Sequence, residues 1–227
     1  MKKIIFSIII ITFLNTASFS HVDHYSKYNY LEYELFRNNK IIGYHKYKFD
    51  RKNKNLTVSS EVNFKITKLG VDLYKYKAVS KENYTNGKLS KFKSVTNQNK
   101  KEKYVNIKID ESDNNLIIDG SSFKGKADKD IIVGTWWNHE IVQKKAQISA
   151  VSGRIIEQKV KFIRKEDVKI GDKTYKTLHF NFSSSDPNLP ENKKLNTDIW
   201  YEEETFLWVK AAFDKTGYWE YRLKKVE

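Results

Sequence analysis

The sequence predicts an all-β domain, mainly antiparallel, built as a curved sheet or barrel-like meander with one short helix. Several segments alternate apolar and polar residues with a period of two, the pattern of a half-buried strand. Turn-forming residues separate these segments at hairpin spacing, and only two prolines occur, Pro187 and Pro190. Because an open sheet of about ten twisted strands tends to curl, split or close, we expect a bent sheet.

The alternation is clearest in residues 58–66, where Val58, Phe64 and Ile66 share one face and polar residues take the other. The pattern recurs in residues 104–109, 178–182 and 207–213. Dipeptides typical of turns lie between such segments: Asn38-Asn39, Asn86-Gly87, Asn114-Asn115, Gly171-Asp172 and Thr216-Gly217. Because type I′ hairpin turns need positive φ at both central positions, which these residues tolerate, the dipeptides predict hairpins.

One segment breaks the alternation and predicts a helix. It starts at Thr135 or Asn138, runs to about Ala150, contains good helix formers and is followed by Gly153. We expect this short helix to lie across one face or mouth of the sheet. Both prolines fall in the clearest long loop, residues 183–192.

Residues 1–20 have the pattern of a signal peptide. Lys2 and Lys3 precede an apolar run over residues 4–14, and Ser18 and Ser20 provide small side chains before the expected cleavage between Ser20 and His21. A transmembrane helix would need roughly 20 apolar residues. With no cysteine for a lipid anchor, we expect export to the periplasm and a single β-rich domain over residues 21–227.

The chain is strongly basic, with a formal net charge of +14. This charge suits an anionic membrane surface as a partner. Of the 42 basic residues only five are arginine, the residue best suited to bidentate phosphate recognition. Since lysines spread along the whole chain, no specific nucleic-acid site is predicted, and A/T-rich codon usage is an alternative source of the charge.

Aromatic residues are numerous, with 14 Tyr, 13 Phe and 5 Trp. On the concave face of a curved sheet they would form an apolar pocket for an amphipathic, lipid-like ligand. The residues that we expect to bind it are Trp136, Trp137, Trp200, Tyr74 and Tyr76. The competing interpretation is packing, since aromatic residues favour strands and cross-strand pairs.

No motif for catalysis, metal or cofactor binding stands out. The five histidines lack a metal-ligand spacing, and no nucleophile elbow or glycine-rich phosphate loop occurs. We therefore predict no catalytic residue and no cofactor. Two alternatives to a binding or carrier protein remain open. One is an envelope hydrolase with a site near His139 or His179, and the other is a structural protein that pairs through an exposed edge strand.

Four short landmarks carry a resemblance to a known family. They are residues 33–43, Gly134-Thr135-Trp136-Trp137-Asn138, Ser152-Gly153-Arg154 and Asp198-Ile199-Trp200-Tyr201. With them, the chain resembles an uncharacterised family of exported proteobacterial proteins built around a domain of unknown function. The resemblance implies a periplasmic all-β domain, distantly similar to the half-barrel carriers of lipoproteins, and it implies no catalytic residues.

Overall fold

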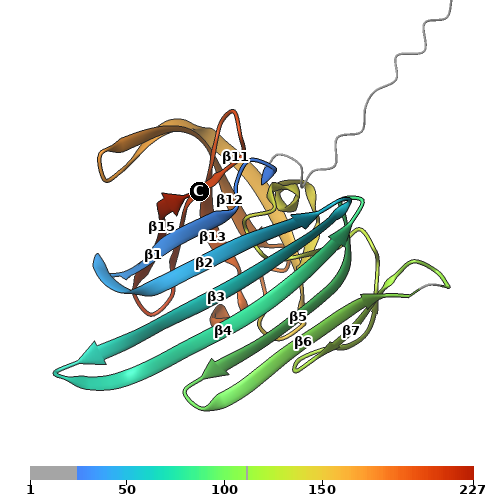
Figure 1. The fold of residues 1–227 in the computed structure, drawn as a ribbon. Coiled ribbons are helices and arrows are strands. Elements are labelled where there is room, and N and C mark those ends of the chain that lie inside the picture. Colours follow the sequence, from blue (N-terminus) through green and yellow to red (C-terminus); the bar gives the residue numbers. More distant parts are fainter. Residues whose placement is uncertain (1–24, 111) are drawn as a thin grey trace, which may run out of the picture.

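The computed structural model describes residues 25–110 and 112–227, which form one sheet of 15 strands (Figure 1). The predicted all-β class and curved sheet are confirmed. No helix in these residues is long and apolar enough to cross a membrane. The predicted signal peptide and its cleavage site lie outside the described residues.

The first eight strands are hairpin partners in chain order: β1 (Tyr30–Arg37), β2 (Lys40–Lys52), β3 (Asn55–Lys68), β4 (Val71–Thr85), β5 (Lys88–Gln98), β6 (Lys101–Ile109), β7 (Leu116–Gly120) and β8 (Lys124–Ala127). The others are β9 (Ile132–Val133), β10 (Ala146–Ile148), β11 (Ile155–Ile170), β12 (Lys173–Ser184), β13 (Asn196–Glu202), β14 (Trp208–Asp214) and β15 (Tyr218–Val226). Short 3-10 helices, η2 (His139–Gln143) and η3 (Glu191–Lys193), interrupt the second set.

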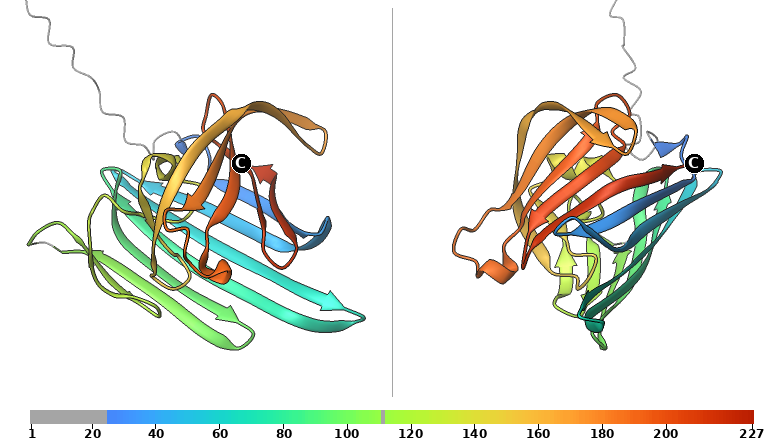
Figure 2. Two further views of the ribbon diagram at one scale, coloured as in Figure 1. Left: turned by 180° about the vertical axis from the view of Figure 1, so that it is seen from behind. Right: turned by 90° about the vertical axis from the view of Figure 1, so that its left-hand side faces the viewer.

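The first and last strands of the chain, β1 and β15, join the two halves of the sheet. β1 pairs with β2 on one side and with β15 on the other, so both lie in the middle of the strand order. The ends of that order are β8 and β9, which follow each other in the chain. The sheet bends round an interior, with β11–β15 (orange to red) forming one wall and β2–β6 (blue to green) the other (Figure 2).

Strand register places the inward side chains of β2 to β5 in rows. One row contains His45, Val62, Ala78 and Thr96, each paired with the next. The adjoining row contains Tyr47, Ser60, Ser80 and Ser94, and the row after it contains Phe49, Val58, Glu82 and Phe92. Because side chains alternate along a strand, all three rows face the interior.

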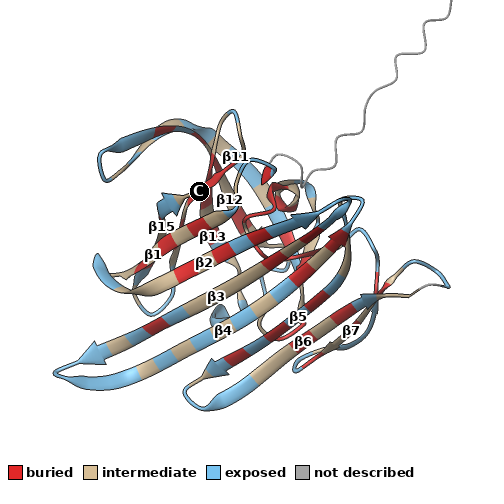
Figure 3. Ribbon diagram, viewed as in Figure 1, coloured by how far each residue is buried: buried red, intermediate tan, exposed pale blue. Residues whose placement is uncertain are grey.

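Buried apolar side chains of the described residues form three clusters; Figure 3 colours all buried residues red along the ribbon. The largest is aromatic: Tyr33 stacks on Trp208 with ring centroids 4.0 Å apart, a contact of about 0.5–1.5 kcal/mol beyond area burial. The second surrounds Phe92 on β5–β7. The third joins Phe64 and Trp219 near the other end of the strands.

The segment predicted as a helix to about Ala150 is helical only over η2. Asn138 caps it as expected, accepting a hydrogen bond from the backbone N–H of Glu140 at 3.1 Å. At the other end, the Gln158 amide donates to the carbonyls of Ile141 and Lys144. The chain then continues as β10, which pairs with β9 in parallel and with β11 in antiparallel. This strand pairing ends the helix early.

Candidate ligand-binding cavity

A cavity of about 190 Å³ lies against the inner face of β2–β5. Its floor is formed by two rows of short side chains, among them Ser60, Val62, Ala78, Ser80 and Ser94. Larger side chains occupy the rows on either side, with Phe49 and Phe92 on one and Phe64 and Tyr76 on the other. Because the floor residues are short, space remains above them.

Two loop segments cover this floor. Gly134, Thr135 and Trp136 form one part of the cover, and Ala150 and Val151 form the other. The Ser94 hydroxyl donates to the carbonyl of Ala150 at 2.5 Å. This bond ties one loop directly to β5.

A buried carboxyl group anchors the other loop. Glu82 is fully buried on β4, accepting hydrogen bonds from Trp137 Nε1 at 3.0 Å and the Tyr84 hydroxyl at 2.6 Å. Burial raises the pKa of Glu82, while hydrogen bonds from Tyr84 and Trp137 oppose that rise. Trp137 therefore fixes the loop that carries Trp136.

His45 supplies the principal polar group of the cavity. It is only 9% exposed, and its Nε2 lies 2.9 Å from Ser60 Oγ. Its Nδ1 is buried and has no hydrogen-bond partner among the described residues. Burial lowers the pKa of His45 to about 3, so the imidazole is neutral at physiological pH.

Aromatic rings complete the lining. Trp136 packs edge-on against Trp208 and Tyr221, with centroids 5.3 Å apart in both cases. Tyr76 stacks on Phe64 at 4.8 Å. Burial raises the pKa of Tyr76 to about 12, so this phenol stays protonated and uncharged. No described lining residue has a side chain charged at neutral pH.

The sequence-predicted binding residues lie in different environments. Trp136 and Tyr76 line the cavity. Tyr74 stacks beside Phe64 at 6.0 Å in the neighbouring cluster, while Trp137 is fully buried in the largest core cluster. Trp200 follows the inward Ile199 and lies on the other face of β13, with its ring 4.2 Å from that of His179.

Sequence reasoning missed His45, Tyr221 and the floor. A usable signal was present, because three neighbouring strands carry small residues two positions apart. These pairs are Ser60 with Val62, Ala78 with Ser80, and Ser94 with Thr96. Recognising their alignment requires the strand register, which follows from the hairpin turns.

His179 belongs to a polar network on the opposite face of the sheet. Its Nε2 lies 2.9 Å from Asp198 Oδ1, and its Nδ1 lies 2.9 Å from Glu166 Oε1. Trp200 Nε1 donates to the same Glu166 oxygen at 2.8 Å. A carboxylate oxygen therefore lies beside each ring nitrogen of His179.

His139, the other histidine of the hydrolase alternative, stacks on Phe206 with centroids 4.5 Å apart. Within residues 25–110 and 112–227, no group of three or more His, Asp or Glu side chains could hold a metal ion. A larger hollow of about 370 Å³ lies beside the β4–β5 turn. Its lining includes side chains of both signs, Lys88, Lys129, Asp130 and Lys144, so it lacks the neutral, aromatic character of the inner cavity.

The fold and cavity define a barrel-like β domain with a small neutral site inside a bent sheet. The chain belongs to the family described as a domain of unknown function, DUF6134, whose profile matches residues 33–224. This confirms the resemblance to an uncharacterised all-β family.

Among solved structures, the chain is similar to a beta-barrel-like protein of the DUF1849 domain of unknown function from Brucella abortus. The two share 12% identity with a TM-score of 0.62, covering 87% of this chain and 96% of that one. At this identity the likeness shows the fold alone. A DUF1329 family protein from Desulfovibrio piger aligns with a TM-score of only 0.24 at 9% identity, over 91% of this chain and 88% of that one. No curated protein matches the sequence.

Proposed function

We propose that the protein is an exported binding or carrier protein whose inner cavity holds the uncharged, apolar part of an amphipathic ligand. The observation that carries this proposal is the cavity lining, which consists of aromatic and hydroxyl side chains with the buried, neutral His45 among them. The lining hydroxyl groups of Ser60, Ser80 and Thr96 can exchange hydrogen bonds with an uncharged polar group of a ligand.

The charge of the lining restricts the chemistry of the ligand. A charged group inside the cavity would lose its hydration without gaining an opposite charge, because none of the described residues that line the space has an ionised side chain. An alcohol, amide or ester carbonyl meets no such penalty. A charged head group therefore belongs outside the cavity, where the basic surface suits an anion.

The size of the cavity restricts how much of the ligand enters. Engineered protein cavities of about 150 Å³ bind benzene, so a space of about 190 Å³ suits a ring or a short apolar segment. We infer that Trp136 and Tyr76 contact this segment while the rest of an amphipathic molecule extends beyond the loops. The proposal includes delivery to the periplasm, for which residues 1–20 supply the expected signal.

Native mass spectrometry of protein purified from a bacterial envelope tests the proposal. We expect an adduct that lipid extraction removes, and a loss of that adduct in the variant Ala78→Phe, because the added ring fills the space above the floor. The variant Val95→Phe is the matched control, since Val95 lies on the outer face of β5 and is 45% exposed. Absence of an adduct from every preparation, or equal adduct in both variants, would count against the proposal.

A further inference from the structure

The turn between β3 and β4 carries an apolar residue at a position where four other hairpin turns carry asparagine. Asn38, Asn53, Asn86 and Asn99 occupy the left-handed region at four other hairpins, as expected for a residue that tolerates positive φ. At the β3–β4 turn that position is Leu69, with φ of 51°. A leucine gains nothing from this backbone conformation, so its presence calls for another explanation.

Apolar side chains concentrate at the same tip. Leu69 is 95% exposed, Val71 62% and Leu73 55%. Contiguous exposed apolar surface of this kind marks a site of contact with another molecule.

The tip also projects beyond its neighbours, as Figure 1 shows. Pairing of β2 with β3 ends at Phe64, and pairing of β5 with β4 ends at Tyr76. Beyond these residues the two hairpin strands pair with each other, and the Asn99 side chain accepts a hydrogen bond from the backbone of Lys75. The tip is thus accessible to a flat surface.

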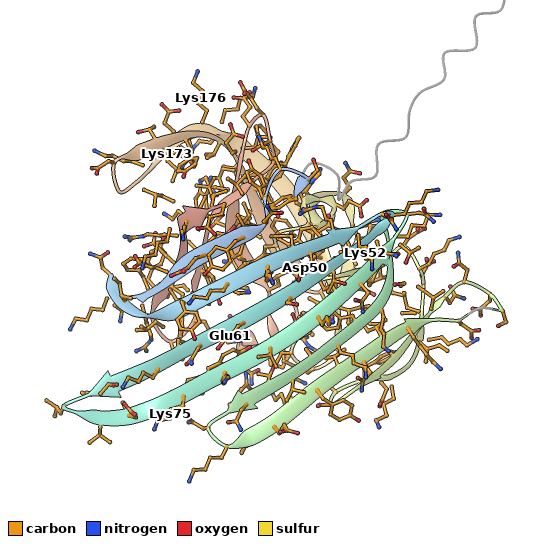
Figure 4. The ribbon with its side chains drawn as sticks, in the orientation of Figure 1. Asp50, Lys52, Glu61, Lys75, Lys173 and Lys176 are labelled. Atoms are coloured by element: carbon orange, nitrogen blue, oxygen red, sulfur yellow. The ribbon has the colours of Figure 1, made fainter. Side chains whose placement is uncertain are left out.

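Positive charge surrounds the apolar tip. Lys65 and Lys75 pair across the hairpin, and Lys68 and Lys77 extend the basic group; Figure 4 labels Lys75 beside the hairpin. The one acidic residue between positions 62 and 81 is Asp72, which lies 3.1 Å from Lys75 and 3.8 Å from Lys65. The tip therefore keeps a net positive charge.

We propose that residues 65–77 form a membrane-docking element for an anionic lipid surface. Leu69, Val71 and Leu73 enter the interfacial region of the bilayer, while the surrounding lysines contact lipid head groups. Apolar tips with basic flanks match such an interface in both hydrophobicity and charge. This complementarity favours a lipid surface over a protein partner.

The hairpin also connects the tip to the cavity. On its inner face Ile66 pairs with Tyr74, Phe64 with Tyr76, and Val62 with Ala78. These apolar pairs lead from the tip to the cavity floor. In this step, which depends on the proposed function, docking places the cavity beside the source or destination of its ligand.

Vesicle co-sedimentation tests the docking proposal. We expect the full chain to bind vesicles of phosphatidylglycerol and phosphatidylcholine in roughly equal amounts, and to bind pure phosphatidylcholine weakly. In the triple variant Leu69→Asn, Val71→Thr and Leu73→Thr, binding should fall at least about tenfold. Asn suits the turn, so thermal stability should not fall.

The matched control removes exposed apolar side chains elsewhere, through Ile41→Thr, Val95→Thr and Phe162→Thr. These residues are 60%, 45% and 50% exposed, and this variant should bind vesicles like the parent chain. Any contribution of the apolar N-terminal segment is equal in all variants. The proposal would be overturned if the tip variant bound vesicles as well as the parent chain, or if the parent chain bound neutral and anionic vesicles equally. It would also be overturned if the tip substitutions abolished a chemical cross-link to another protein and left vesicle binding unchanged. If the tip variant retains the cavity adduct, a failure of the docking proposal can be told apart from a failure of the proposed function.

Discussion

Trp137 and Glu82 are joined by a buried hydrogen bond of 3.0 Å between residues 55 positions apart in the chain. The bond connects the loop over the cavity to the inner face of β4, and the Tyr84 hydroxyl donates a second hydrogen bond to the same carboxyl group. Since both donors and the acceptor are buried, the arrangement is stable only when all its members are present.

Replacing Glu82 should therefore destabilise the fold. In Glu82→Ala the indole N–H and the Tyr84 hydroxyl lose their acceptor, and we expect a loss of at least about 2 kcal/mol in the free energy of unfolding. Glu82→Gln keeps an acceptor oxygen and should lose less. Urea unfolding measures both values; an alanine variant as stable as the parent would contradict this account of the loop.

Glu82 should also make stability depend on pH. Burial raises its folded-state pKa above the ordinary value of 4.5. Between pH 4.5 and that raised pKa, the folded chain therefore binds more protons than the unfolded chain. Its contribution is then fully present below about pH 4.5 and is lost as the pH rises through the folded pKa. Melting temperatures across this interval should change less with pH in Glu82→Gln than in the parent, whereas identical slopes would exclude a raised pKa.

His45 should have the opposite effect on the pH dependence of folding stability. Burial lowers its folded-state pKa to about 3 from 6.5, so the unfolded chain binds more protons between these values. Its unfavourable effect is absent above about pH 6.5 and grows as the pH falls towards 3. The variant His45→Gln, which cannot titrate there, should lose less stability on acidification. A steeper loss in the variant would refute the buried neutral imidazole.

Substitutions of Trp136 and Trp200 should have different effects on ligand binding. Trp136 lines the cavity, whereas Trp200 packs on His179 and Glu166 on the other face. We expect Trp136→Ala to weaken binding of the fluorescent probe N-phenyl-1-naphthylamine several-fold and Trp200→Ala to leave it unchanged. Equal loss in both variants would indicate that the probe binds elsewhere.

The unusual turn at Leu69 predicts a gain of stability on its replacement. Leu69→Asn should stabilise the fold by about 1 kcal/mol, because leucine is strained in the left-handed region and asparagine is tolerated. Asn86 precedes a glycine in the same way, with φ of 51°, so Asn86→Leu should cost a similar amount. Chemical denaturation of both variants checks the pair, and a stabilising Asn86→Leu would contradict it.

The sequence was most informative where structure is local. Alternation over residues 58–66 and the turn Asn86-Gly87 predicted β3 and its neighbours, because a hairpin forms between adjacent segments. Pairing of β9 with β10 joins segments separated by η2, and such pairing leaves no periodic pattern to read. The cover over the cavity was therefore predicted as a longer helix.

The candidate site was predicted only in part for a related reason. Aromatic identity favoured Trp136 and Trp200 equally, since composition does not indicate which face of the sheet a side chain occupies. Burial of His45 depends on packing from Tyr33 and Tyr47, with ring centroids 6.3 and 4.3 Å away, which only the assembled sheet provides.

Competition between 1-decanol and decanoate for the site of N-phenyl-1-naphthylamine tests the central claim most directly, because the two chains differ in the charge of the polar group. At neutral pH we expect decanol to displace the probe at a concentration at least about tenfold lower than decanoate, since no described lining residue carries a positive charge to pair with a carboxylate. Decanoate should displace the probe more strongly as the pH falls and its own carboxyl group becomes protonated. Stronger displacement by decanoate at neutral pH, or no displacement by either compound, would contradict a neutral binding cavity.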